Sequence, residues 1–237
     1  MSLQCIILAG GLGTRMRPLT DKMPKALVPV MGTPFADWQL RRLAHQGVER
    51  VVYSIGHHGA MLREFVGDGS RYGLAVDWVD EGPRLLGTGG ARRRALDVGA
   101  LEEAFFVLYG DSYLPTDLRR VERAWCDSGL PALMTILRNQ DRWDRSNAVY
   151  ADGRVLLYDK SRPPQWRSRM HWIDYGLSVL TQPVIANAVA PEAVFDLADL
   201  MRQLSINGLL AGLEVTERFY EVGSPEGVRD LENYLSA

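Results

Sequence analysis

The stretch CIILAGGLGTRMRPLTDKMPK, residues 5–25, decides the fold of this chain of 237 residues. It opens with a short apolar run, which is typical of a buried strand in a parallel sheet, and passes directly into a glycine-rich turn. Glycines lack a β-carbon, so backbone N–H groups in such a turn can converge on an anion. Arg15 and Lys25 add positive charge beside the turn. The stretch therefore predicts a phosphate-binding loop after the first strand.

The turn differs from two common phosphate-binding motifs. It lacks the glycine-lysine-serine/threonine ending of an ATPase-type P-loop, and the third glycine of a dinucleotide-binding fingerprint would fall at Met16. An ordinary strand-to-loop turn requires only one or two glycines. We therefore expect a phosphate-binding loop of another type.

The composition is that of a globular protein, and we expect one domain over residues 1–237. A net charge of −2 without a basic stripe argues against nucleic-acid and membrane partners. The basic cluster Arg92–Arg94 falls in a helical pattern, so we expect a solvated helix face there. Cys5 and Cys126 imply neither a disulfide framework nor a zinc cluster. With no signal region and no apolar run of membrane-spanning length, the cytoplasm is the expected compartment.

Strand-like and helix-like segments alternate through roughly the first half of the chain, which predicts a three-layer, doubly wound α/β fold with a mostly parallel mixed sheet. The predicted strands are residues 5–9, 48–55, 74–79, 104–109, 132–137, 148–150, 155–158, 172–180, 213–215 and 219–222. The predicted helices are residues 35–46, 61–66, one that ends at 101, 117–126, 195–206 and 225–235. Residues of about 141–170 are expected to cover a substrate.

Three glycine-bearing loops should form one site. In open α/β sheets ligands bind beyond the carboxyl ends of the strands, so the loops after strands 5–9, 74–79 and 104–109 should face one crevice. Asp111 follows the last of these strands and could hold a magnesium ion on the phosphates of a nucleotide, because magnesium takes few protein ligands. Glu221 ends the last strand and could reach the same crevice.

Two further acidic positions could serve a sugar phosphate. Asp159 and Lys160 follow the strand 155–158, and they offer a carboxylate for hydroxyl groups beside an ammonium for phosphate. Such neighbours at a strand end are commonplace. Asp174 lies inside an apolar strand, and a buried acid needs a partner, so it is either paired or part of the site.

These motifs resemble those of the sugar-1-phosphate nucleotidyltransferases from end to end. The matching segments are Leu8-Ala9-Gly10-Gly11-x-Gly13-Thr14-Arg15-x-Arg17-Pro18-Leu19-Thr20 with Pro24-Lys25, Leu86-Gly87-Thr88-Gly89-Gly90-Ala91, Tyr109-Gly110-Asp111, Tyr158-Asp159-Lys160 and Phe219-Tyr220-Glu221-Val222-Gly223. Asp159, Ser161 and Glu221 depart from the family's glutamate, proline and aspartate. A longer acid at residue 221 could still reach a metal, with altered geometry.

The resemblance implies the Rossmann-like fold of the nucleotide-diphospho-sugar transferases and a role for each site residue. Arg15 and Lys25 would be catalytic, acting on the pyrophosphate and on the charge between the two phosphates, and Asp111 and Glu221 would hold Mg²⁺. The nucleotide would be bound by Leu8, Ala9, Gly10, Gly11, Gly13, Thr14, Glu81, Gly87, Thr88 and Gly110, and the sugar phosphate by Asn147, Asp159, Lys160, Asp174 and Gly176. The implied partners are a nucleoside triphosphate and a sugar 1-phosphate, and the oligomeric state is not readable.

The base and the sugar are predicted from one acidic residue and from the second glycine-rich loop. Guanine presents two adjacent donors, which a carboxylate accepts, whereas an amide suits uracil or thymine better. Glu81 is the candidate reader of guanine, and the loop at residues 86–91 looks most like the heptose- or mannose-1-phosphate guanylyltransferase branch. The alternative is a uridylyltransferase for a muramic-acid-type or other hexose 1-phosphate. An alternative of another class is a non-catalytic nucleotide-sugar binding protein.

Overall fold

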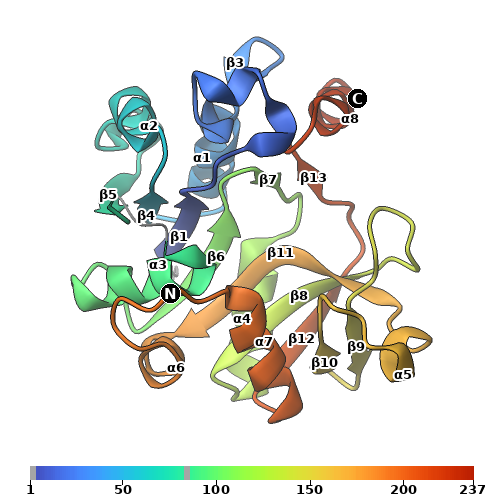
Figure 1. Ribbon diagram of the computed structural model, residues 1–237. Coiled ribbons are helices and arrows are strands. Elements are labelled where there is room, and N and C mark those ends of the chain that lie inside the picture. The colour runs from blue at the N-terminus through green and yellow to red at the C-terminus, as the bar shows by residue number, and fades with distance from the viewer. Residues whose placement is uncertain (1–3, 83–85) are drawn as a thin grey trace.

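The computed structural model describes residues 4–82 and 86–237, and it contains a central nine-stranded mixed sheet (Figure 1). The strand order is β5-β4-β1-β6-β11-β8-β12-β10-β9. These strands are β1 (Gln4–Ala9), β4 (Arg50–Ile55), β5 (Ala75–Asp80), β6 (Ala104–Tyr109), β8 (Ala132–Arg138), β9 (Ala148–Ala151), β10 (Arg154–Tyr158), β11 (Trp172–Thr181) and β12 (Leu210–Val215). The neighbouring strands β5, β4, β1 and β6 pair in parallel. Strand β11 is antiparallel to both β6 and β8.

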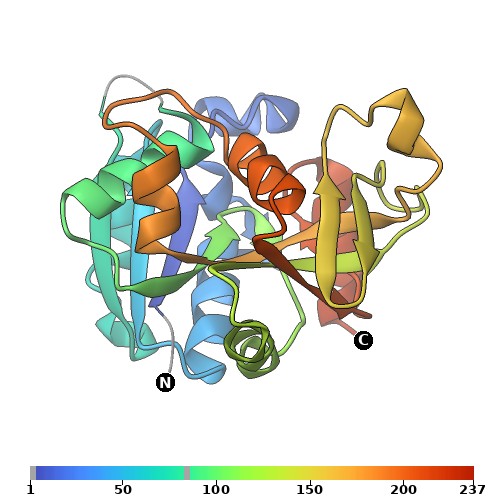
Figure 2. The same ribbon diagram turned by 90° about the horizontal axis from the view of Figure 1, so that it is seen from below.

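Helices cover both faces of the sheet (Figure 2). One face packs against α1 (Phe35–His45), α2 (Gly59–Val66) and α4 (Leu118–Ser128), and the other against α3 (Gly87–Asp97), α6 (Gln182–Ala188) and α7 (Leu197–Ile206). In β1, Cys5 and Ile7 join the first core and Ile6 joins the second. A strand buried on both faces reads as a continuous apolar run, which is why residues 5–9 predicted it. The three-layer α/β fold is thereby confirmed.

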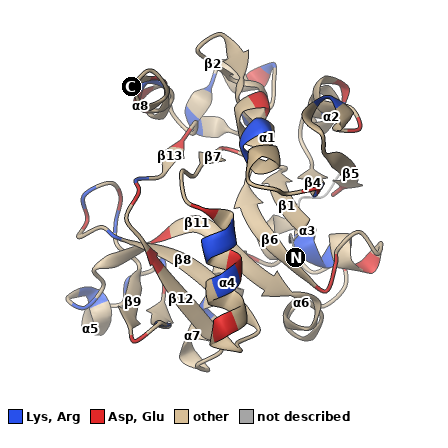
Figure 3. Ribbon diagram, turned by 180° about the vertical axis from the view of Figure 1, so that it is seen from behind, with Lys and Arg blue, Asp and Glu red and all other residues tan. Residues whose placement is uncertain are grey.

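Helix α4 illustrates how the pattern of apolar residues directs packing. It buries Leu118 and Val121 against the sheet, whereas Arg119 and Arg120 between them are exposed. Figure 3 marks the charged positions along this helix. Asp117 caps its first turn by accepting a hydrogen bond from the Arg119 backbone N–H. In the described part of the chain, no helix has the length and apolar character needed to cross a membrane.

A third, smaller core joins the two ends of the chain. Val30, Phe35, Tyr113, Val222 and Leu231 are buried together, and we call them the Val30 cluster. They come from β2 (Pro29–Val30), which pairs with β3 (Thr33–Pro34), from α1, from β7 (Ser112–Tyr113), from the residue after β13 (Tyr220–Glu221) and from α8 (Pro225–Leu235). The cluster holds α8 beside the amino-terminal segment (Figure 1).

The segment of about residues 141–170 lies at the β9 edge of the sheet. It contains the β9–β10 hairpin and the short helix α5 (Pro164–Arg167), and it buries Val149, Leu157 and Met170 with Trp166 in a cluster of its own. The antiparallel pairs β9–β10 and β10–β12 connect this hairpin to the rest of the sheet.

Several boundaries differ from the sequence predictions. Helix α3 ends at Asp97 and not at residue 101, because Gly99 (φ +71°) begins a Schellman ending in which its N–H donates to the Leu96 carbonyl and the Ala100 N–H to the Ala95 carbonyl. Helices α5 and α6 were not predicted, since each has at most seven residues and too few turns to show a helical period.

The expectation of a solvated helix face at residues 92–94 is wrong for Arg92. Its side chain is fully buried, because this position lies on the buried side of α3 together with Ala91 and Ala95. Arg93 and Arg94 lie at the sides of the helix, where Arg93 pairs with Asp97 and Arg94 donates to the Asp80 carbonyl.

Replacing Gly227 by alanine should destabilise the protein. Gly227 lies in the first turn of α8, and an added β-carbon would meet the Glu221 carbonyl oxygen well inside van der Waals contact. Helix propensity alone would make alanine about 1 kcal/mol more stable. The clash with backbone should outweigh this gain, so we expect a net loss of roughly 1–2 kcal/mol in thermal or denaturant unfolding.

Asn233→Ala, on the exposed face of the same helix, is the control and should leave stability unchanged or slightly raised. A Gly227→Ala protein as stable as its parent would mean that α8 is not packed this closely on β13.

Candidate active site

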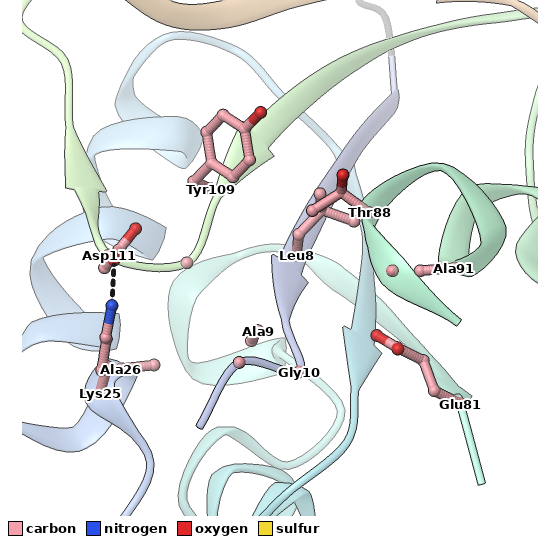
Figure 4. Close-up of a pocket in the computed structure, with 13 residues that line it drawn as sticks. Leu8, Ala9, Gly10, Lys25, Ala26, Glu81, Thr88, Ala91, Tyr109 and Asp111 are labelled. Carbon is pink, nitrogen blue, oxygen red and sulfur yellow. Dashed lines mark hydrogen bonds and ion pairs between the residues drawn. The ribbon is translucent and has the colours of Figure 1, made fainter. Parts of the chain in front are cut away.

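One pocket opens at the carboxyl ends of β1 and β6, beside the first turn of α3 (Figure 4). Its wall is formed by Leu8, Ala9, Gly10, Gly11, Lys25, Ala26, Glu81, Gly87, Thr88, Ala91, Tyr109, Gly110 and Asp111. The three predicted glycine-bearing loops therefore meet in one crevice. Gly13 and Thr14 belong to the first loop but are not among the lining residues, and neither Ala26, Ala91 nor Tyr109 was predicted.

Glu81 lies at one end of the pocket, against the first glycine of the loop. A β-carbon on Gly10 would lie well inside van der Waals contact of Glu81 Oε1, so a larger residue at position 10 would push the carboxylate away from the loop. The Ser54 hydroxyl donates to Glu81 Oε1 at 3.2 Å. Burial raises the pKa of Glu81, and the hydrogen bond from Ser54 opposes this shift. The acid is thus held at the pocket wall with a fixed orientation.

Lys25 and Asp111 form an ion pair at the opposite end, with Lys25 Nζ 2.8 Å from Asp111 Oδ2 (Figure 4). The first loop folds back to place the lysine there. Gly13 adopts a left-handed conformation (φ +64°), and its carbonyl accepts a hydrogen bond of 2.8 Å from the Thr20 hydroxyl. A β-carbon on Gly13 would lie 3.0 Å from the Lys25 side chain, so residue 13 must stay small and left-handed for the lysine to pass.

Glu221 lies beside Asp111 because β13 pairs with β7. In this antiparallel ribbon residue 221 stands opposite Ser112, and the Val222 N–H donates to the Asp111 carbonyl at 2.8 Å. Although Glu221 is an exposed residue, desolvation raises the pKa of its carboxyl group, and the negative charge of Asp111 raises it further. The two predicted acids therefore share one location.

Arg15 completes this charged group. A β-carbon built on Gly223 would lie 3.2 Å from Arg15 Nη2 and 3.9 Å from Asp111 Oδ2. Arg15 and Lys25 both act to lower the pKa of Glu221. Two cations thus accompany two carboxylates, a mixture that can bind anions and a cation together. Lys25 and Asp111 line the pocket, whereas Arg15 and Glu221 lie beside them and are not among its lining residues.

The acid pair fits a magnesium ion. Carboxylate oxygens are the hard ligands that magnesium prefers, and the ion usually takes only one or two of them beside phosphate and water. Within residues 4–82 and 86–237, no group of three or more histidine, cysteine, aspartate or glutamate side chains could hold a metal. The described residues therefore do not provide a complete set of such ligands around a metal ion.

The predicted sugar-phosphate residues lie just before β9, just after β10 and within β11, and they differ in whether their side chains are free to bind a ligand. Asn147 Oδ1 accepts a hydrogen bond from the Asp174 N–H, and Asp174 Oδ1 accepts one from the Gly176 N–H. Burial raises the pKa of Asp174, and the positive charge of Lys160 opposes the shift. Asp174 is thus hydrogen-bonded to two of its four predicted companions, and the charge of a third, Lys160, acts on it.

Asp159 is the exception. Arg202 on α7 donates to its Oδ2 at 2.8 Å, and the Ser161 backbone and hydroxyl both donate to its Oδ1. Both carboxylate oxygens are thus engaged by the protein itself. The backbone N–H of Asp159 donates to the Asn147 carbonyl, so the residue stays next to the group while its carboxylate points to α7.

Glu221→Gln should change the pH dependence of stability in metal-free protein. A raised pKa in the folded state adds stability below the pKa of the unfolded chain, near 4.5, and this contribution is lost as the pH rises through the folded pKa. At pH 7.5 the repulsion between the Asp111 and Glu221 carboxylates destabilises the wild type, and the glutamine variant lacks this repulsion. In thermal unfolding with chelator, the variant should melt higher at pH 7.5, and the gap should close below about pH 4.5.

Glu64→Gln, on the exposed face of α2, removes the same charge away from Asp111 and should show no such gap. Equal melting of the Glu221→Gln variant and the wild type at both pH values would mean that the two acids do not interact.

Comparisons with known proteins place the chain in one family. Residues 4–146 match the family model described as nucleotidyl transferase. N-acetylmuramate alpha-1-phosphate uridylyltransferase of Neisseria meningitidis serogroup B is 38% identical over 224 residues, which are 94% of each chain. D-glycero-alpha-D-manno-heptose 1-phosphate guanylyltransferase of Campylobacter jejuni is 24% identical over 225 residues, 94% of this chain and 96% of that protein.

Other relatives are longer than this chain. It is 24% identical to a UTP--glucose-1-phosphate uridylyltransferase of Synechocystis over 222 residues, which are 87% of this chain but only 56% of that protein. Among solved structures, HddC from Yersinia pseudotuberculosis has the same fold, with a TM-score of 0.80, 23% identity, and coverage of 98% of this chain and 99% of that one. The matched family model, the full-length similarity and the shared fold agree, and the chain belongs to the nucleotidyl transferase family.

Proposed function

We propose that this protein transfers a nucleoside monophosphate from a nucleoside triphosphate, GTP, to a heptose- or mannose-type sugar 1-phosphate, and releases pyrophosphate. The observation that carries the proposal is the pair of Lys25 and Asp111 at one end of a pocket whose other end holds Glu81, with Arg15 and Glu221 beside that pair. A triphosphate lying along this pocket would place its base at Glu81 and its phosphates among the charged group.

The negative charges of the two phosphate substrates explain the roles of Arg15 and Lys25. A sugar phosphate loses its second proton near pH ~6, so its attacking oxygen needs no general base at neutral pH. This oxygen bonds to the α-phosphorus while the bond to the pyrophosphate oxygen breaks. Arg15 and Lys25 reduce the repulsion between the two anions and stabilise the leaving pyrophosphate. Asp111 and Glu221 would hold Mg²⁺, which would supply further positive charge beside the phosphates.

Glu81 supports guanine as the base. Its Oε1 already accepts one hydrogen bond from Ser54, and each carboxylate oxygen can accept two, so capacity for both guanine donors remains. Uracil presents a single donor between two acceptors and would leave carbonyl oxygens facing a carboxylate.

The second candidate is a uridylyltransferase acting on a muramic-acid-type or other hexose 1-phosphate. It is favoured by the 38% identity to the Neisseria meningitidis protein over 94% of both chains. Incubation with GTP, UTP and dTTP in turn, each with mannose, glucose, heptose and N-acetylmuramic acid 1-phosphates, separates the two by the pair that releases pyrophosphate. Turnover of any pair excludes a protein that only binds nucleotide sugars.

Lys25→Ala should abolish measurable pyrophosphate release without unfolding the protein. Lys25 is a preorganised cation at the charged group, and loss of one such donor typically lowers the rate by a factor of about 100 to 1,000. Initial rates with saturating substrates test this, with circular dichroism as the check on folding. Lys22→Ala, an exposed cation in the same loop, should keep the wild-type rate.

Glu81→Gln should move base preference away from guanine. The amide keeps one acceptor and brings a donor that opposes a guanine N–H, so kcat/KM for GTP should fall about 10-fold to 100-fold while that for UTP holds or rises. The ratio of the two kcat/KM values is the measurement. An unchanged ratio would show that backbone groups, and not Glu81, read the base.

A further inference from the structure

Helix α1 and the residue that ends it carry a stripe of polar side chains toward the stretch of chain between β6 and α4. Gln39, Arg42 and Gln46 recur at helical spacing, and their donors bind backbone carbonyls in that stretch. Most of the stretch lies outside a sheet ladder, so its buried carbonyls need side-chain partners. Gln39 is the most deeply buried of the three, with 3% of its surface exposed.

The Gln39 amide joins the two ends of the turn that carries Asp111. Its Nε2 donates to the Tyr109 carbonyl and to the Ser112 carbonyl, each at 2.9 Å. These two carbonyls flank residues 110 and 111, so one amide group closes the turn from behind. Both donor hydrogens of the amide are thereby used. Figure 4 shows Tyr109 and Asp111 on this turn.

The same amide is linked to Glu221 through the backbone. Ser112 pairs with Glu221 in the β7–β13 ribbon, and the Val222 N–H donates to the Asp111 carbonyl at 2.8 Å. A bond that fixes the Ser112 carbonyl therefore also fixes the strand against which Glu221 lies. Gln39 thus stands behind both acids that the proposed function assigns to Mg²⁺.

Packing alone does not hold this turn in place. Gln39 and Ser112 line a small cavity together with several leucine side chains, so the backbone has space to shift if its hydrogen bonds are lost. Within the described part of the chain, the buried Oε1 of Gln39 has no hydrogen-bond partner. The glutamine therefore acts through its donor end, which faces the turn.

We propose that Gln39 is a positioning residue for the metal-binding acids. It holds residues 109–112 so that Asp111 and Glu221 present their carboxylates to one cation. Removal of groups that orient metal ligands typically lowers metal affinity about 10-fold to 100-fold. This inference rests on the proposed function, which assigns the two acids to Mg²⁺.

Gln46, at the end of the same helix, provides a matched control. Gln39→Met and Gln46→Met each remove an amide that makes two hydrogen bonds, because Gln46 Nε2 donates to the Thr116 carbonyl and its Oε1 accepts from the Leu118 N–H. Residues 116 and 118 lie beyond β7, outside the turn. Thermal unfolding and Mn²⁺ binding are measured without substrates, the latter from the electron paramagnetic resonance signal of the free ion. Asp111→Asn defines the Mn²⁺ binding that belongs to this site.

The wild type should bind Mn²⁺ at a site that Asp111→Asn removes. Both methionine variants should melt lower, because each loses two hydrogen bonds. Gln39→Met should in addition bind Mn²⁺ about tenfold more weakly, whereas Gln46→Met should keep the wild-type affinity. If Gln39→Met does not fold, Gln39→Asn replaces it. The shorter asparagine keeps an amide but cannot span both carbonyls, so Mn²⁺ affinity should again fall.

Wild-type Mn²⁺ affinity in the folded Gln39 variant would overturn the inference. An equal loss of affinity in Gln46→Met would also overturn it, since the effect would then be a general loosening of the fold. Mn²⁺ binding that is absent, or that persists in Asp111→Asn, would mean that the acids do not hold the ion, and the inference would fall with it. Failure of the proposed function is recognised separately, because the wild type would then release no pyrophosphate with any substrate pair, whatever the Mn²⁺ titrations show.

Discussion

The site depends on holding two carboxylates side by side against their mutual repulsion. Asp111 follows β6 in the centre of the sheet, and Glu221 comes from the far end of the chain. The β7–β13 ribbon aligns them, and the Val30 cluster beneath it anchors the ribbon to α1 and α8. The cost of bringing the acids together appears in the raised pKa of Glu221, and Arg15 and Lys25 offset part of it.

Strand β6 organises the pocket because it lies where the direction of the sheet changes. It pairs in parallel with β1 on one side and antiparallel with β11 on the other. Its last residue, Tyr109, and the two that follow therefore stand between the glycine-rich loop after β1 and the residues around Asp174 on β11. Under the proposed function, a single strand end would thus face both substrates of the transfer.

Burial opposes the charged form of two side chains, Glu81 in the pocket wall and Arg92 on α3 next to the lining residue Ala91. Desolvation raises the pKa of Glu81 and lowers that of Arg92, so each charged form is disfavoured by its surroundings. Proteins keep such groups where a ligand will later use their charge or orientation, and compensate elsewhere with a well-packed core. Here the compensation comes from two large cores, one on each face of the sheet.

The sequence by itself determined the features that are local in the chain. The apolar run before the first glycines predicted β1, and the residues Arg15, Lys25 and Asp111 stood out because each follows directly from a strand or turn with recognisable chemistry. Tyr109 could have been found in the same way, since it is the last residue of a strand whose next two residues were already assigned. The family followed from these motifs.

Only the tertiary structure decided which distant groups meet. The sequence could not place Glu221 beside Asp111, because their proximity depends on the pairing of β13 with β7. The Asp159 carboxylate accepts a hydrogen bond from Arg202 on α7. Arg92 is buried, although the charge pattern of its helix predicted exposure. Periodicity and turn chemistry describe neighbours in sequence, whereas burial and pairing are set by which surfaces pack together, and that depends on the whole chain at once.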